Sequence, residues 1–321
     1  MDDAEWQLLS DIARRFYIED VSKTELAETF SMSRFRVARL LQQAREEGVV
    51  TIEINERDAD RAALSEDLAA HLRLQECIVV KAGDTEDDNR RRLARAAAAH
   101  IKSRVRDGDV VGFSWGRTLL AVAERLTDLA PCTVVQLTGT VGKDFARSPV
   151  EVIRRIADQS SVEAVPIYAP LFATSEAAAR SLRSDQVIKS ALSLYADLGV
   201  AVLSVGSWEP PITELPAILT SADRQELSFK QAKAEMAGIF LREDGTAIDA
   251  KATRRRISVS VSELAGTPCV LAVAGSVEKA GAIAAAARSG LITSLITDDR
   301  TAVALRRLPA VESHVLDRRS R

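Results

Sequence analysis

From residue 76 onward, short apolar runs alternate with stretches of helical periodicity, and this alternation constrains the fold more than any other feature. The candidate strands are Cys77–Lys81, Val110–Phe113, Thr133–Leu137, Val162–Ile167, Val200–Val205, Val270–Ala274 and Thr293–Ile296. Alanine-rich or amphipathic helices separate most of them, for example Arg91–Arg104 and Val277–Arg288. The alternation predicts an α/β domain with a largely parallel sheet. A chain of 321 residues can hold this domain and a smaller one.

The first 55 residues follow a different pattern, in which helical stretches precede an alternating strand. Apolar side chains recur on one face of the first stretch, as Trp6, Leu9, Ile12, Ala13 and Phe16. Ser22 and Glu25 have capping-box spacing at the start of a second helix. Ser33 can cap a third helix from about Arg34 to Glu46, and residues 50–54 alternate as a wing strand does. This order predicts a winged helix-turn-helix domain over residues 1–55.

The third helix has an inward and an outward face. Val37, Leu41 and Ala44 have the spacing of a buried stripe. The outward residues that we expect to contact DNA are Ser33, Arg34, Phe35, Arg36, Arg39, Gln42 and Gln43. Arg and Gln pair bidentately with guanine and adenine edges, and Phe can contact a thymine methyl group. An ordinary solvated helix face is the alternative interpretation.

The bulk charge does not favour nucleic-acid binding. The whole chain has a formal net charge of −3, and residues 1–55 hold seven Lys and Arg against eleven Asp and Glu. The DNA-binding hypothesis therefore depends on the outward face of the third helix.

Small and polar residues follow several of the predicted strands, where the loops of a parallel sheet meet. Glycine lets backbone N–H groups approach an anion, and Arg or Lys adds positive charge. We expect one effector cleft lined by Ser114, Gly116, Arg117, Thr118, Thr138, Gly139, Thr140, Val141, Gly275 and Lys279. Asp249 and Asp298 could accept hydrogen bonds from ligand hydroxyl groups. The pattern predicts a site for an anionic ligand such as a phosphate, and ordinary turn glycines are the alternative.

Residues 56–75 have the spacing of a single linker helix, with Leu64, Leu68 and Leu72 on one face. This helix could couple or dimerise the domains, or it could pack on the surface of the second domain, residues 76–321. Its surroundings are not rich in Pro, Gly or Ser, so a floppy tether is not expected.

Composition excludes several classes of protein. Hydrophobic residues make up 46% and charged residues 28%, as in a folded globular protein. No apolar run is long enough for a membrane span, and the acidic opening MDDAEWQLL is unlike a secretory signal peptide. The three cysteines are widely separated and lack CxxC spacing. We therefore expect a cytoplasmic protein without disulfides, bound metal or cofactor.

Several of these residues resemble the winged helix-turn-helix of SorC-type bacterial transcription regulators, which respond to sugars. The matching positions are Phe16-Tyr17, Leu26-Ala27, Ser33-Arg34, Val37, Arg39-Leu40-Leu41 and 44–52. Between the two arginines the family has a small residue or proline, then Thr, then Val-Ser, where this chain has Phe35, Arg36, Val37 and Ala38. These departures lie partly on the outward face, so the resemblance does not imply the operator sequence.

The resemblance continues through the second domain and covers nearly the whole chain. Its segments are 112–118, 134–139, Ala169-Pro170, Asp244-Gly245, Val273–Gly275, Lys279-Ala280, Ile283, 295–298 and Ala302. It implies an effector domain similar to ribose-5-phosphate isomerase and glucosamine-6-phosphate deaminase that binds sugars or sugar phosphates. Some members carry a Schiff-base lysine where this chain has Thr138, so covalent capture of an aldehyde is not expected. The double glycine of the family is reduced to Gly139-Thr140.

The sequence leaves two enzymatic alternatives open. Residues 112–116 fit the G-x-S-x-G nucleophile elbow of α/β-hydrolases, and Ser114, Asp298 and His314 follow the chain order of that triad. However, His314 lies in a polar tail, and the short motif arises easily by chance. A sugar-phosphate isomerase or deaminase would need a carboxylate or His base beside the ligand, and no His falls in a predicted strand-end loop.

The sequence thus predicts a ligand-responsive regulator rather than an enzyme. A Rossmann-like effector domain would bind a sugar, polyol or sugar phosphate. A dimer or tetramer would place recognition helices in successive major grooves of double-stranded operator DNA. No membrane association is expected.

Overall fold

The computed structural model describes residues 3–50, 59–142, 148–313 and 315. The chain divides into two compact units, residues 1–58 and 59–321, each of which is described by itself. Among the described residues, no helix combines the length and the apolar character needed to cross a membrane.

The first unit contains the helices α1 (Asp3–Tyr17), α2 (Lys23–Thr29) and α3 (Arg34–Glu46). Ser22 and Glu25 form the expected capping box, in which each side chain accepts from the backbone N–H of the other residue. The Ser33 hydroxyl accepts from the Arg36 N–H and begins α3. The helices share a core of Leu9, Ile12, Ala13, Leu26, Val37, Leu41 and Ala44. The expected wing strand lies largely in residues 51–58, outside the described residues.

The second unit is built on a seven-stranded sheet in which every pair of neighbouring strands is parallel. Its order is β1-β10-β9-β5-β2-β3-β4. The strands are β1 (Glu76–Val80), β2 (Val110–Phe113), β3 (Thr133–Gln136), β4 (Glu163–Val165), β5 (Leu198–Ser204), β9 (Cys269–Val273) and β10 (Ser294–Asp298). The predicted α/β domain with a parallel sheet is confirmed.

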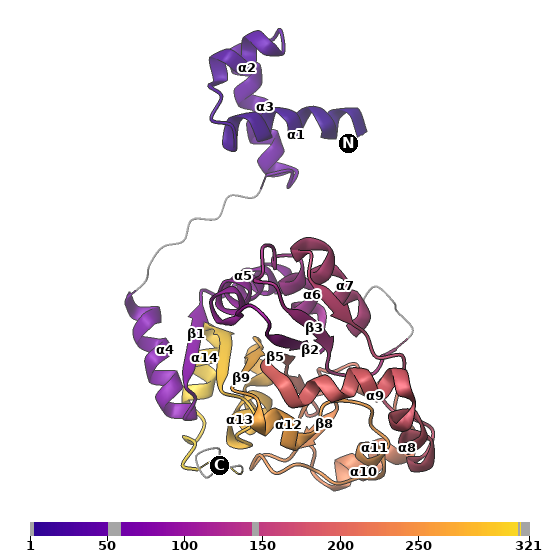
Figure 1. Cartoon of the computed structure of the whole chain (residues 1–321). Coiled ribbons are helices and arrows are strands. Elements are labelled where there is room, and N and C mark those ends of the chain that lie inside the picture. Colours follow the sequence, from indigo (N-terminus) through magenta and orange to yellow (C-terminus); the bar gives the residue numbers. More distant parts are fainter. Residues whose placement is uncertain (1–2, 51–58, 143–147, 314, 316–321) are drawn as a thin grey trace. The chain divides into compact units, whose positions relative to one another are not determined.

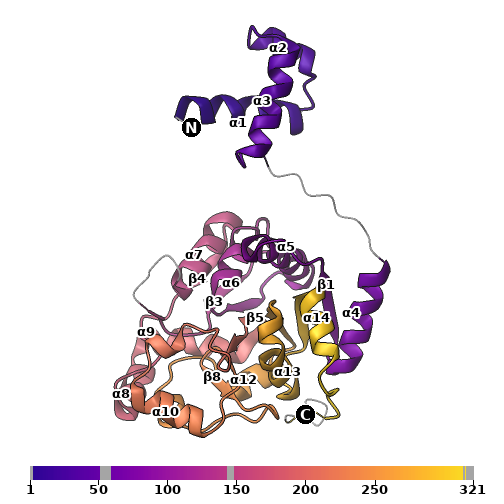
Figure 2. The ribbon, with the colours of Figure 1, turned by 180° about the vertical axis from the view of Figure 1, so that it is seen from behind.

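Helices cover both faces of this sheet (Figures 1 and 2). One layer consists of α5 (Glu86–Arg104), α6 (Arg117–Ala123) and α7 (Pro149–Ser160). The other layer includes α4 (Ala59–Leu72), α9 (Gln186–Ser193), α12 (Val261–Gly266), α13 (Ala280–Arg288) and α14 (Asp299–Arg306). The remaining helices are α8 (Glu176–Ser184), α10 (Ser221–Phe229), α11 (Lys251–Arg254) and the 3-10 turns η2 (Leu194–Asp197), η3 (Leu215–Ala217) and η4 (Val277–Lys279).

The apolar run of strand β5 is continuous because both faces of the strand are buried. Val200 and Val202 contribute to the core under α5–α7, while Ala201 and Leu203 contribute to the core on the opposite face. Successive strand residues point to opposite faces, and here both faces are covered. A buried strand of this kind therefore carries no polar alternation.

The chain reverses its direction of travel across the sheet between β2 and β5. From β2 it continues outward to β3 and β4, and from β5 it continues the other way to β9 and β10. The adjacent strands β2 and β5 therefore form a topological switch point, where ligands bind in open α/β sheets.

A small antiparallel sheet, β6 (Gly206–Ser207), β7 (Ala234–Met236) and β8 (Ile239–Leu241), was not predicted. Its strands have two or three residues each, too few to show a period of two.

The expected linker helix of residues 56–75 corresponds to α4, which is shorter and belongs to the second unit. Leu68 and Leu72 are buried in the core beside β1 and α14, and Leu64 packs against it. An ion pair of 2.8 Å also joins Asp67 to Arg306 of α14. Packing on the second domain is thus the arrangement that the structure shows.

Gly139 packs closely against the backbone of Ala169 and Pro170, and this contact can be tested. A Cβ atom at Gly139 would lie 2.5 Å from the Pro170 carbonyl carbon, so backbone would have to move. We expect Gly139→Ala to lower the free energy of unfolding by about 1–3 kcal/mol. In α12, Gly266 has no atom within 4 Å of the added Cβ. Gly266→Ala should instead raise it by roughly 0.5–1 kcal/mol. Urea unfolding followed by circular dichroism measures both, and equal effects would contradict the packing.

Candidate functional site

A pocket of about 520 Å³ opens at the switch point. Its walls come from the loops after β2, β5 and β9, from the first turn of α5 and from the small sheet. The lining residues are Glu86, Asn89, Arg90, Leu93, Trp115, Gly116, Arg117, Thr118, Ser204, Val205, Gly206, Pro211, Ile212, Thr213, Glu214, Glu235, Gly275, Ser276 and Lys279. Its volume falls in the range of small-molecule sites.

Five of the predicted effector residues line this pocket: Gly116, Arg117, Thr118, Gly275 and Lys279. Parallel strands explain the convergence, because the carboxyl ends of β2 and β9 lie at the same edge of the sheet. Residues more than 150 positions apart along the chain are thereby brought into one site.

Ser114 and Asp298 lie behind the pocket wall rather than on it. The Ser114 side chain is fully buried, and its hydroxyl accepts from the Ser204 N–H at 3.3 Å. Asp298 caps α14 by accepting from the Thr301 N–H at 2.8 Å, and it also accepts from the Asn89 amide at 3.1 Å. A Cβ at Gly275 would meet Asp298 Oδ2 at 2.4 Å. Asp298 therefore supports the pocket floor and positions Asn89.

The loop of Thr138, Gly139, Thr140 and Val141 does not line this pocket. The Gly139 N–H donates to the Ile257 carbonyl and the Thr140 N–H to the Ala169 carbonyl, both at 2.8 Å. These two amides are therefore engaged within the protein, contrary to the anion-binding role expected of them. Thr138 is fully buried, and Val141 joins an apolar cluster with Trp115.

Asp249 also lies outside the pocket. It is exposed and accepts two hydrogen bonds from the Arg254 guanidinium, at 2.9 and 2.6 Å. Arg254 also lowers the pKa of Asp249. The carboxylate is thus paired locally at the surface.

Glu235 is the most deeply buried charged residue among the pocket residues that the sequence did not indicate, which also include Glu86, Asn89 and Arg90. It lies on β7 and is 4% exposed. One oxygen accepts from the Thr213 hydroxyl at 2.9 Å, and Oε2 has no hydrogen-bond partner among the described residues. Burial raises the pKa of Glu235 to about 7, against the hydrogen bonds and the Lys279 charge that lower it. Strand β7 has three residues, too few for an alternating pattern in the sequence to indicate that the Glu235 side chain is buried.

Lys279 is a half-buried cation of the pocket. Its Nζ donates to the Val205 carbonyl at 3.0 Å, and burial lowers its pKa while Glu235 opposes that shift. Within the described residues, no direct ion pair joins Lys279 and Glu235. The Glu235 carboxyl, with an Oε2 unpaired among the described residues, and the Lys279 ammonium donor thus line the same cavity. Together they can bind ligand hydroxyl groups.

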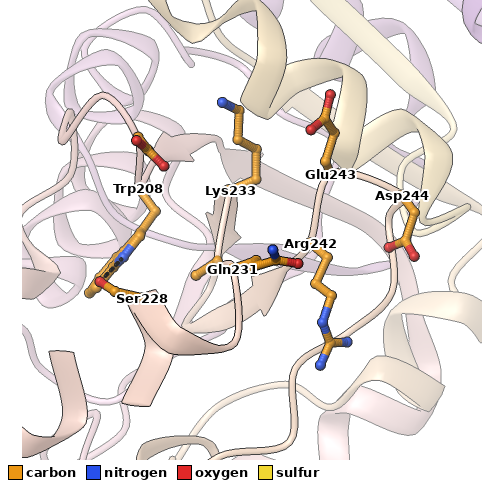
Figure 3. Close-up of a pocket in the computed structure, with 9 residues that line it drawn as sticks. Trp208, Ser228, Gln231, Lys233, Arg242, Glu243 and Asp244 are labelled. Atoms are coloured by element: carbon orange, nitrogen blue, oxygen red, sulfur yellow. Dashed lines mark hydrogen bonds between the residues drawn. The ribbon is translucent and has the colours of Figure 1, made fainter. Parts of the chain in front are cut away.

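A second pocket, of about 630 Å³, lies beside the end of the small sheet (Figure 3). Its lining residues are Trp208, Glu209, Ser228, Gln231, Ala232, Lys233, Arg242, Glu243 and Asp244. The Trp208 indole N–H donates to the Ser228 hydroxyl at 3.4 Å. None of the residues predicted to bind the effector lines this pocket.

The outward face of α3 is largely free of contacts with the rest of the first unit. Ser33, Arg34, Arg36, Arg39 and Gln42 are exposed. Phe35 is 90% exposed, which is exceptional for a large apolar side chain. Gln43 differs, because its amide donates to Glu5 of α1 at 2.9 Å. The Gln42 amide donates to Glu46 at 2.8 Å, along the same helix.

The structure does not assemble a hydrolase site from its described residues. Ser114 is fully buried, Asp298 is engaged as a helix cap, and His314 lies outside the described residues. Across the described part of the chain, no three His, Cys, Asp or Glu side chains gather as a metal site.

Comparisons with known proteins agree with this geometry. Residues 57–306 match the sequence model of the family described as "Putative sugar-binding domain". The deoxyribonucleoside regulator of Bacillus subtilis is 29% identical over 95% of this chain and 99% of its own length. The sorbitol operon regulator of Klebsiella pneumoniae is 24% identical over 92% of this chain and 96% of its own. The crystal structure of full-length SorC from Klebsiella pneumoniae shares the fold, with a TM-score of 0.76 and 22% identity over 95% of this chain and 99% of that one.

The buried Glu235 carboxyl generates a prediction about pH. Its native pKa of about 7 lies above the ordinary 4.5, so the native state keeps a proton that the unfolded chain has released. The carboxyl therefore destabilises the protein increasingly as pH rises through this window. Glu235→Gln cannot titrate. From pH 5 to pH 8, its free energy of unfolding should rise relative to the parent by on the order of 2 kcal/mol. Urea unfolding checks this, and Glu243→Gln, at an exposed position, should show no such trend.

Proposed function

The chain belongs to the SorC-type regulators that carry the "Putative sugar-binding domain", and we propose that it is a DNA-binding transcriptional regulator controlled by a small carbohydrate. The effector is a sugar, polyol or sugar phosphate, and it modulates the affinity for operator DNA. One observation carries this conclusion: the match extends over nearly the full length of relatives named as regulators. Because these relatives are regulators, the protein is not the sugar-phosphate isomerase or deaminase weighed from the sequence.

The first unit is the DNA-reading domain in this proposal, a winged helix-turn-helix with α3 as recognition helix. The exposed guanidinium groups of Arg34, Arg36 and Arg39, together with Phe35, support base contacts. Ser33 and Gln42 lie on the same exposed face. Gln43 would have to release Glu5 before it could reach a base.

The pocket at the switch point is the effector site in this proposal. It belongs to a Rossmann-like domain that resembles ribose-5-phosphate isomerase and glucosamine-6-phosphate deaminase. Glu235 would accept and Lys279 would donate hydrogen bonds to ligand hydroxyls. Thr118 and Asn89 supply further polar groups along the wall. Their placement on strand ends and helix starts supports a preformed site.

Regulation requires that the two sites be coupled. We place the protein in the cytoplasm as a dimer or tetramer, whose two recognition helices occupy successive major grooves of an operator. Effector binding would change subunit packing and so the separation of the helices, which changes operator affinity.

Arg39 tests the DNA-reading face. Its exposed side chain points away from the core that Val37 and Leu41 form, so Arg39→Ala should leave the fold intact. We expect it to weaken specific operator binding by about 1–3 kcal/mol. Fluorescence anisotropy with an operator selected from random DNA measures the loss.

Arg45 provides the matched control, because it is also an exposed arginine of α3 but lies outside the predicted set. Arg45→Ala should change specific and non-specific binding by equal amounts. If Arg39→Ala behaves in the same way, Arg39 does not read bases.

Lys279 tests the effector site. A cognate carbohydrate, found by a thermal-shift panel, should change operator affinity of the parent protein and be recovered unconsumed by mass spectrometry. Lys279→Ala should abolish this response while basal operator binding survives, because α3 belongs to the other unit. Lys233→Ala, at the second pocket, should respond normally. Repeated turnover of the carbohydrate would contradict the regulator assignment.

A further inference from the structure

One oxygen of Glu86 is shared by two arginines at the rim of the effector pocket. Glu86 Oε1 lies 2.8 Å from Nη2 of Arg90 and 3.1 Å from Nη2 of Arg117. All three residues line the pocket, although they come from α5 and from the start of α6. A carboxylate of the protein thus binds both rim guanidinium groups at once.

This contact neutralises the charge that would attract an anion. The acidic lining residues are Glu86, Glu214 and Glu235, and the basic ones are Arg90, Arg117 and Lys279. With Glu86 in place and Glu235 ionised, the charges of the pocket lining balance, and loss of Glu86 leaves an excess positive charge in either protonation state of Glu235. An anionic group that bound Arg90 and Arg117 would have to displace Glu86.

Such displacement is energetically easy. The Glu86 side chain is 71% exposed, so its ion pairs are well solvated and contribute little to stability. The Arg90 side chain is only 15% exposed and is also paired with Asp87, so it keeps its place when Glu86 leaves. A phosphate offers more charge and more acceptor oxygens than one carboxylate, and a guanidinium binds it bidentately.

We infer that Glu86 is an internal competitor for the anionic group of the effector, and that it sets how strongly the pocket prefers phosphorylated over neutral carbohydrates. The inference rests on the proposed function only in taking this pocket as the effector site. It assigns the phosphate to Arg90 and Arg117 and leaves Glu235 and Lys279 to the hydroxyl groups.

The experiment compares the full-length parent with Glu86→Gln and Asp87→Asn. Asp87 is the matched control, because it also pairs with Arg90 but does not line the pocket. Each protein is titrated with inorganic phosphate by isothermal calorimetry at constant ionic strength. We expect Glu86→Gln to lower the Kd for phosphate about three- to fivefold, in line with the loss of exposed ion pairs. Asp87→Asn should stay within a factor of two of the parent, because the Asp87 ion pair is exposed and does not have to break when phosphate enters the pocket.

A double variant locates the bound anion. Arg117→Gln added to Glu86→Gln should remove the gain, because the freed guanidinium is then absent. The inference is overturned if Asp87→Asn gains as much as Glu86→Gln, if Glu86→Gln gains nothing or binds no phosphate, or if the gain survives without Arg117. Circular dichroism of each variant excludes misfolding. Failure of the proposed function would look different: the phosphate results would follow Glu86, while no carbohydrate would alter operator binding.

Discussion

The parallel sheet buried on both faces is the constraint on which the rest of the second unit depends. Because α5, α6 and α7 cover one face and α4, α9, α13 and α14 cover the other, no side of the sheet is left for a ligand. Only the strand ends remain, and there the reversal between β2 and β5 separates the loops that follow them. The pocket is therefore a consequence of topology before any particular side chain is considered. Specific residues then determine what it can hold.

Those residues combine buried and exposed charges with different tasks. Glu235 is buried and Lys279 half-buried in the pocket, and desolvation moves both pKa values toward the neutral forms. Glu86 and Arg117 lie at the rim, where water screens their ion pair and keeps it exchangeable. A carbohydrate could thus be held by directional hydrogen bonds inside and by charge at the entrance. This division follows from burial rather than from residue type, since both places hold a Glu together with basic side chains.

The sequence predicted the seven strands of the large sheet and the three helices of the first unit well, because the strands are apolar runs and the helices have a hydrophobic period or a cap such as Ser22 or Ser33. It also placed Arg117 and Lys279 at one edge of the sheet, since parallel strands require this. It did not reveal that the amides of Gly139 and Thr140 are used by Ile257 and Ala169, because such pairing joins segments remote in sequence. Glu235 was missed for a related reason: burial is a property of tertiary structure, and a three-residue strand carries no period.

The cap of α14 lies directly beneath the pocket. Asp298 holds both the first turn of α14 and the Asn89 amide of the pocket wall. At its other end, α14 pairs with α4 through Arg306 and Asp67, and α4 is the first helix after residues 51–58, which join it in sequence to the first unit. The pocket floor is thus connected to α4 through α14, and also through β1, which pairs with β10 at Asp298 and packs against α4. In the proposed function, effector binding at the pocket would thus act on the same elements that hold α4 in place.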